Sequence, residues 1–273
     1  MKVQLLGTGS ADGWPNPWCG CASCTWARGA GQARTHTAAL VDDVLLLDCG
    51  PDVPKTAARL GVSLAGVRHL LLGHAHPDHT GPEALMWRGW STVRARPLDV
   101  VGPPAALAAC RHWVGPDDPV RFVEVQAGDR LPVGRYQVRV LPAAHGDATV
   151  GPAVLYDLMG PDGRLLYATD TAPPPAAALD AAAGAGYDVV LLEETHGDRG
   201  GPGDHLDLAS FAATCAELRR RGAVTERTRV VAVHLGHGNP PGPELARRLG
   251  LLGAELLAEG DVVGAGPPPP RAR

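Results

Sequence analysis

The stretch Gly73-His74-Ala75-His76-Pro77-Asp78-His79-Thr80-Gly81 places three histidines and one aspartate within six consecutive positions. It directly follows the apolar run Val67–Leu72, which has the length and composition of a buried strand. Pro77 and Gly81 disfavour a regular helix, so we expect a loop at the end of that strand. Imidazole and carboxylate ligands suit zinc, iron or manganese, and two such ions roughly 3.5–4 Å apart can act together in hydrolysis. The segment therefore predicts a metal site at the edge of a sheet.

Outside this segment the chain is divided into short apolar runs, which predict strands, and stretches with helical spacing of apolar residues. In the helical stretch Leu208–Arg221, Asp207 is a suitable N-cap and Gly222 a suitable stop. Strands gathered into two blocks with helices between them predict an α/β (α+β) fold with four layers, helix, sheet, sheet and helix. The other predicted strands are Val3–Leu6, Ala38–Val41, Val44–Leu47, Leu98–Val101, Val138–Leu141, Val154–Leu158, Leu165–Ala168, Val189–Leu192 and Val230–Val233, and the other predicted helices are Val53–Leu60, Pro82–Trp87, Pro104–Trp113, Pro175–Ala183 and Pro243–Leu252.

Composition indicates an ordinary globular protein. The chain has 273 residues, of which 45% are hydrophobic, and a net charge of −4. We expect a single domain over residues 1–265, followed by a disordered, Pro-rich tail over residues 266–273. The net charge disfavours nucleic acid as a partner and favours a small-molecule substrate. The sequence has no apolar stretch of membrane-spanning length and no signal region, so we expect a cytoplasmic protein that does not bind membranes.

Three of the six cysteines are crowded together as Cys19, Cys21 and Cys24. In a cytosolic chain this spacing suits a metal better than disulfides. Tetrahedral zinc needs a fourth ligand, and His237 is the candidate because it lies three residues beyond His234 and can face away from the other site. A reactive or redox-active thiol cluster is the alternative.

The histidine-rich segment matches the HxHxDH signature of the metallo-β-lactamase superfamily, which the chain resembles over roughly residues 1–239. In that family a histidine at a strand end, a metal-bridging aspartate and a final histidine follow in order, and His145, Asp170 and His234 look like their counterparts. The resemblance implies the four-layer αββα metallo-β-lactamase fold and two divalent ions of zinc, manganese or iron. It implies that His74, His76 and His145 hold one ion, that Asp78, His79 and His234 hold the other, that Asp170 bridges them, and that Asp48 orients ligand histidines.

The cysteine triplet narrows the resemblance to the PhnP-type cyclic phosphodiesterases, a branch that binds a structural zinc through such a triplet and a later histidine. The opening Leu5-Leu6-Gly7-Thr8-Gly9-Ser10 is also typical of phosphodiesterase-like branches. By this resemblance Cys19, Cys21, Cys24 and His237 bind a structural zinc. The resemblance also suggests a homodimer.

His205, within Asp204-His205-Leu206-Asp207-Leu208, is similar to the histidine of the NHCDL-like segment that protonates the leaving group in PhnP-like enzymes. An imidazolium can offset negative charge and donate a proton at neutral pH. His196 also follows a predicted strand and could compete for this role or line the cleft. The resemblance implies hydrolysis of a small, for instance cyclic, phosphodiester by metal-hydroxide attack, with Asp78 and His205 as catalytic residues.

Other functions remain open at this point. Lactone or thioester hydrolysis uses the same ions to polarise a carbonyl. The PqqB-like proteins of quinone-cofactor biosynthesis share the cysteine loop and the fold but act in oxidation, and the full HAHPDH motif favours a hydrolase over them. The tRNase Z-like enzymes share the ligand set, although the sequence has no basic insertion that would serve as an RNA-binding arm. The missing signal peptide disfavours an antibiotic β-lactamase, and a non-enzymatic binding module leaves the ligand set unexplained.

Overall fold

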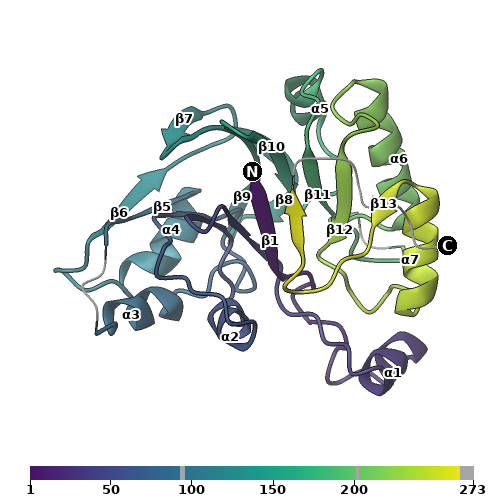
Figure 1. Ribbon diagram of the computed structural model, residues 1–273, viewed down its shortest axis with the longest axis horizontal. Helices are drawn as coiled ribbons and strands as arrows, with labels where there is room; N and C mark the ends of the chain where they lie inside the picture. The colour runs from purple at the N-terminus through teal and green to yellow at the C-terminus, as the bar shows by residue number, and fades with distance from the viewer. Residues whose placement is uncertain (93–95, 201–202, 265–273) are drawn as a thin grey trace.

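The computed structural model describes residues 1–92, 96–200 and 203–264. Within these residues two seven-stranded sheets pack against each other, with α2, α3 and α4 outside the first sheet and α5, α6 and α7 outside the second (Figure 1). The strand order is β14-β1-β2-β3-β4-β5-β6 in the first sheet and β13-β12-β11-β10-β9-β8-β7 in the second. This confirms the predicted order of layers, helix, sheet, sheet and helix.

Both sheets are mixed, with one parallel and one antiparallel half. The strands of the first sheet are β1 (Lys2–Gly7), β2 (Ala38–Val41), β3 (Leu45–Leu47), β4 (His69–Leu71), β5 (Leu98–Gly102), β6 (Val120–Glu124) and β14 (Val262–Gly264). The strands of the second are β7 (Arg130–Val133), β8 (Tyr136–Asp147), β9 (Gly151–Gly160), β10 (Gly163–Ala168), β11 (Val189–Glu193), β12 (Arg229–Val233) and β13 (Ala254–Glu255). Every predicted strand forms. The four additional strands, β6, β7, β13 and β14, are the edge strands, which bury few residues and so lack a continuous apolar run.

The six predicted helices also form. They are α2 (Val53–Arg59), α3 (Glu83–Gly89), α4 (Pro104–Arg111), α5 (Ala176–Ala182), α6 (Leu208–Arg220) and α7 (Gly242–Leu251). The start of α6 agrees with the prediction, because Asp207 Oδ1 accepts a hydrogen bond from Ser210 N–H at 2.7 Å in a capping box. One further helix, α1 (Ala22–Gly29), was not predicted; the Sγ atom of Cys21, its N-cap, accepts a hydrogen bond from Cys24 N–H at 3.4 Å.

The strands of the parallel halves are apolar throughout because both of their faces are buried. In β3, for example, Leu45 and Leu47 join the core between the two sheets, whereas Leu46 joins the core beneath the outer helices. Strands β3 and β4 run parallel, as do β10, β11 and β12. Within each sheet the carboxyl ends of these strands therefore lie side by side, and the segments that follow them start there. The segments bearing Asp48, the histidine motif, Asp170 and His234 start at these edges.

The predicted domain boundary at residue 265 and the Pro-rich tail at residues 266–273 lie outside the described residues. None of the helices in the described ranges combines the length and the apolar character that crossing a bilayer requires.

Candidate metal centre

The histidine-rich segment leaves β4 as a loop that is tied to the segment after β3. The N–H of Cys49 donates a hydrogen bond to the carbonyl of His79 (3.0 Å), and the N–H of Gly81 donates to the carbonyl of Cys49 (2.6 Å). Gly50 permits this approach, because a Cβ there would lie 2.0 Å from the carbonyl oxygen of Asp78. The backbone therefore fixes the positions from which the polar side chains extend.

A first cluster contains His74, His76, His145 and Asp170, with one ligand atom from each residue within 4.8 Å of the others. Nδ1 of His76 lies 2.7 Å from Nε2 of His74 and 3.2 Å from Nε2 of His145. Asp170 Oδ2 lies 3.4 Å from Nε2 of His74 and 3.6 Å from Nε2 of His145. The structure thus brings together the three histidines predicted for one ion and the predicted bridging aspartate.

A second cluster contains Asp78, His79, Asp170 and His234, again with ligand atoms within 4.8 Å of one another. Nε2 of His79 lies 3.0 Å from Asp78 Oδ2 and 3.2 Å from Asp170 Oδ1. Nε2 of His234 lies 3.3 Å from Asp78 Oδ2 and 3.0 Å from Asp170 Oδ1. Asp170 therefore directs Oδ2 to the first cluster and Oδ1 to the second, which is the placement a bridging carboxylate requires.

Asp48 is fully buried beside the second cluster and contacts His79, as predicted. Its Oδ2 accepts a hydrogen bond from His79 Nδ1 (2.7 Å) and from the hydroxyl of Tyr167 (2.8 Å), and its Oδ1 accepts one from Gly73 N–H (2.8 Å). With the proton of His79 on Nδ1, the lone pair of its Nε2 is left for a ligand bond. Tyr167 was not predicted as part of the site, because a tyrosine within an apolar strand is more often a core residue.

Three residues of this region have left-handed backbone, with φ angles of 56° at Asp48, 57° at Asp170 and 56° at His234. Each lies just beyond the end of a strand, β3, β10 or β12. Positive φ is uncommon for residues other than glycine and tends to occur at functional sites. The backbone turns at these positions so that the side chains extend into the shared clusters.

The donor set fits divalent cations. Burial together with the charges of neighbouring histidines holds the pKa of His74 well below its usual range, so its imidazole is neutral. Although burial opposes ionisation, His234 and His79 hold the pKa of Asp170 well below its usual range. His79 Nε2 is buried and has no hydrogen-bond partner among the described residues, although it lies close to two carboxylates. Although burial lowers the pKa of His79, the charges of Asp170, Asp78 and Asp48 raise it well above its usual range, so a cation bound here would displace a proton from this imidazole. Imidazole nitrogens and carboxylates that converge in this way could hold two ions.

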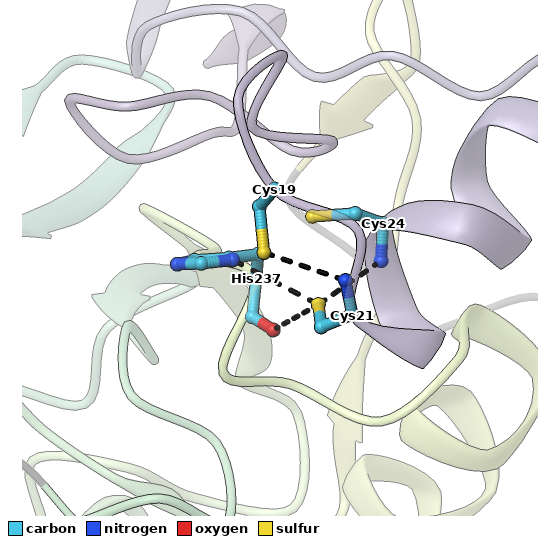
Figure 2. Close-up of side chains that lie close together, drawn as sticks. All are labelled: Cys19, Cys21, Cys24 and His237. Atoms are coloured by element: carbon cyan, nitrogen blue, oxygen red, sulfur yellow. Dashed lines mark hydrogen bonds between the residues drawn. The ribbon is translucent and has the colours of Figure 1, made fainter.

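A separate cluster unites Cys19, Cys21, Cys24 and His237, as predicted, with ligand atoms within 4.8 Å of one another (Figure 2). His237 Nδ1 lies 3.8 Å from Cys21 Sγ, and Cys21 N–H donates a hydrogen bond to Cys19 Sγ at 3.5 Å. Although burial raises the pKa of the Cys21 thiol, hydrogen bonds from Cys24 N–H and neighbouring groups bring it down to about 6, which favours the thiolate. Three thiols and one imidazole are the ligands of a closed tetrahedral zinc site.

Asp12 lies on the outer side of His237. Its Oδ2 is 3.4 Å from His237 Nε2, and its carboxylate accepts hydrogen bonds from Ser10 Oγ (2.9 Å) and Asn16 Nδ2 (2.7 Å). The carboxylate therefore orients the imidazole so that Nδ1 faces the thiols. No pattern in the sequence indicates this role, because Asp12 lies in a polar loop.

His205 lies next to the two clusters of candidate metal ligands, and with Glu193 and His234 it forms a further group whose ligand atoms lie within 4.8 Å of one another. Its ring centroid is 4.7 Å from that of His145 and 5.1 Å from that of His234, on which it stacks. Its Nδ1–H donates a hydrogen bond to Oε2 of Glu193 at 2.9 Å. Burial lowers the pKa of His205, but the hydrogen bond and charge of Glu193 outweigh this and raise it to about 9. An imidazolium is therefore present at neutral pH beside the candidate metal centre.

Glu193 is a functional residue that sequence reasoning missed. It is fully buried at the end of β11, where its Oε2 accepts hydrogen bonds from Thr195 Oγ1 (2.5 Å) and Leu206 N–H (3.3 Å) in addition to His205. Thr195 Oγ1 also lies 2.9 Å from Nδ1 of His234. An acidic residue at the end of an apolar run was the available signal, and Asp48 and Asp170 also follow apolar runs.

His196 lies farther from the candidate metal ligands than His205. Its ring centroid is 5.5 Å from that of His205, and its Nε2 is 3.5 Å from Asp204 Oδ1. Among the described residues it belongs to none of the clusters that could hold a metal. Of the two histidines considered for the acid, the geometry places His205 in the better position.

The family comparison agrees with the fold and the site. The model of the beta-lactamase superfamily domain matches residues 44–235, which is more than half of the chain. The chain therefore belongs to the metallo-β-lactamase superfamily. The predicted metallo-β-lactamase fold is confirmed, and the chain is a metal-dependent hydrolase of that fold.

Solved structures with the same fold include a diphosphatase of the PhnP family and zinc-bound PqqB from Methylobacterium extorquens. The first has a TM-score of 0.76 at 20% identity and covers 96% of both chains. The second has a TM-score of 0.74 at 19% identity and covers 96% of this chain and 99% of PqqB. At these identities the likeness shows the fold alone.

Curated relatives in sequence are named Ribonuclease Z. The protein from Mycolicibacterium paratuberculosis is 34% identical over 211 residues, or 68% of each chain. The protein from Mycobacterium avium is 38% identical over 126 residues, or 42% of this chain and 40% of the relative. The chain thus spans between about two fifths and two thirds of the length of these two relatives.

We expect Asp48→Asn to weaken metal binding at the candidate metal centre about 10- to 100-fold, because His79 loses the charged acceptor that orients it. Competition with a chelator measures the affinity. Asp43→Asn is the matched control, since Asp43 is exposed in the neighbouring turn and, among the residues that the structure describes, forms an ion pair with Lys2 alone. Equal metal affinity of the wild type and Asp48→Asn would contradict the orienting role of Asp48.

We expect Cys19→Ser to remove one equivalent of zinc per chain and to lower the Tm, because a zinc ion held by this cluster would link the N-terminal loop to His237. Elemental analysis and thermal unfolding measure the two effects. Cys110→Ser, which alters a buried cysteine in α4, should keep the zinc. Wild-type protein with three freely titratable N-terminal thiols and no zinc at this site would contradict the interpretation.

Proposed function

We propose that the protein hydrolyses a small phosphodiester, with His205 as the general acid. The observation that carries the proposal is the hydrogen-bonded pair of Glu193 and His205 directly beside a ligand set for two cations. The names of the relatives, Ribonuclease Z and a diphosphatase of the PhnP family, support a reaction at phosphorus more than one at a carbonyl carbon.

The candidate ligands would divide between two ions. Two divalent cations at this site would supply Lewis acidity and lower the pKa of a bound water. His74, His76 and His145 would hold one ion, Asp78, His79 and His234 the other, and Asp170 would contact both. Asp48 fixes the ring of His79, and the buried position of most of these groups limits competition by bulk water.

His205 would protonate the leaving oxygen. Its Nδ1–H is bound to Glu193, so the Nε2–H is the group that can donate to a substrate. Glu193 has two effects, since its carboxylate fixes the ring orientation and its charge keeps the imidazole protonated at neutral pH. Thr195 extends this network to Nδ1 of His234, so the acid and one candidate metal ligand share their orienting groups.

An RNA phosphodiester is a second candidate substrate, favoured by the relatives named Ribonuclease Z. The net charge of −4 and the absence of a basic insertion in the sequence favour a small substrate instead.

Hydrolysis of a lactone or thioester would use the same ions, but no observation favours it. The likeness to PqqB is a likeness of fold alone. The two clusters with a shared aspartate favour hydrolysis over oxidation.

We expect the chain, supplied with manganese and zinc, to hydrolyse bis(p-nitrophenyl) phosphate and not the corresponding monoester. Asp78→Ala should abolish the diester rate, because the second cluster loses a carboxylate. Initial-rate assays with both esters, and with an RNA carrying a 3′ extension, distinguish a small diester from an RNA substrate. No diester rate from fully metal-loaded protein would contradict the proposal.

We expect His205→Ala to lower kcat about 10²- to 10⁴-fold without loss of metal, because the leaving oxygen loses its proton donor. His196→Ala should keep kcat near the wild-type value. Turnover and metal content, measured on the same preparations, test the assignment. An unchanged kcat for His205→Ala, or a loss as large for His196→Ala, would contradict it.

We expect Glu193→Gln to shift the pH profile of kcat to lower pH. The acid must be protonated, so wild-type activity falls as the pH rises through the pKa of His205, about 9. Without the charge of Glu193 this pKa drops, and activity is lost at lower pH. Glu194→Gln, which alters the neighbouring buried glutamate, is the matched control. Identical alkaline limbs for the wild type and Glu193→Gln would contradict the role of Glu193.

A further inference from the structure

A cavity of about 610 Å³ is lined by residues of β3, β4, β5, α2 and α3 and of the segments next to them. In Figure 1, α2 and α3 lie outside the first sheet. The floor of the cavity is formed by Leu46, Leu70 and Leu98, which belong to three neighbouring strands or their ends, and Trp87 of α3 contributes to its wall. None of the candidate metal ligands lines it. The cavity is therefore separate from the candidate metal centre.

The cavity is partly open to solvent, so its volume is to be compared with that of surface pockets. Pockets for small molecules have volumes of about 300–1,000 Å³ and mainly apolar walls. Most of the residues that line this cavity are apolar, so the occupant must present an apolar body to it.

The polar part of the lining is cationic. Arg68, Arg88 and Arg96 all line the cavity, and no acidic residue does so among the described residues. Arg68 and Arg96 form no ion pair within the described ranges. Burial lowers the pKa of Arg68, and the like charge of Arg96 lowers it further. Asp118 acts on Arg88 and offsets part of its charge.

The position of Arg68 is fixed by its own segment. Its Nη1 donates hydrogen bonds to the carbonyls of Ala65 (3.2 Å) and Val67 (2.7 Å). The guanidinium is therefore held at the cavity wall, which reduces the entropy lost when it binds an anion. An anionic head group between Arg68 and Arg96 would relieve their repulsion and form charge-assisted hydrogen bonds.

We propose that this cavity binds an anionic amphiphile, a molecule with a single aliphatic chain and a carboxylate head group. The chain lies along Leu46, Leu70 and Leu98, and the head group contacts Arg68 and Arg96. The proposal does not depend on the reaction at the candidate metal centre, because the two sites share none of these residues.

Calorimetric titration of the full-length protein with decanoate tests the proposal, with decanol and acetate as probes that each lack one half of the ligand. We expect saturable binding of one decanoate per chain, at least about tenfold weaker binding of decanol, and none of acetate. Decanoate should also raise the Tm of the wild type, since it binds only the folded state.

Arg68→Gln and Arg96→Gln should each weaken decanoate binding about tenfold, because each removes a charge and keeps the size of the side chain. Arg227→Gln, at an exposed position before β12, is the matched control and should bind like the wild type. Ala84→Leu, which extends a side chain into the cavity, should abolish binding.

Absence of saturable decanoate binding to folded protein would overturn the proposal. Equal affinities for decanoate and decanol, unaffected by Arg68→Gln and Arg96→Gln, would overturn it as well, because binding would then not involve the arginines. The two glutamine variants keep the test decisive if Ala84→Leu fails to fold.

Discussion

The site depends on the contacts that the buried carboxylate of Asp170 makes with histidines of both clusters. One of its oxygens lies among the imidazoles of the first cluster and the other among those of the second, and the side chain is almost completely buried. Asp78 and Asp48 are buried nearby, and none of the three carboxylates forms an ion pair with a lysine or arginine within the described ranges. Buried negative charge must be balanced, and divalent cations held by the converging imidazoles and carboxylates are the compensation that this ligand set fits.

The two-sheet architecture makes this concentration of charge possible. Asp48, Asp170 and His234 lie just beyond the ends of buried strands, whereas His145 lies within β8, so the positions of these groups follow from the register of the sheets. At Asp48, Asp170 and His234 the backbone adopts positive φ, a conformation that costs free energy and that rigid surroundings can maintain. The same architecture places Glu193 at the end of β11, where it orients His205 toward the clusters.

Much of the fold and of the candidate site could be predicted from the sequence, for identifiable reasons. The HxHxDH segment is local, and His145, Asp170 and His234 each end an apolar run, so their place at a sheet edge follows from the strands. The edge strands escaped prediction because they bury few residues. Glu193 was not predicted because Glu194 follows it directly in the sequence. Only the structure shows that Glu193 is the one that contacts His205. Asp12 and the cavity escaped because both depend on how distant segments pack together, which no local pattern records.

The central claim, that Asp170 bridges two ions, can be tested directly by crystallography. Anomalous diffraction from crystals of the protein grown with manganese would locate the ions in the electron density. We predict two anomalous peaks roughly 3.5–4 Å apart, with the carboxylate of Asp170 between them. One peak should lie among His74, His76 and His145, and the other among Asp78, His79 and His234. A single peak, or two peaks neither of which contacts Asp170, would contradict the claim.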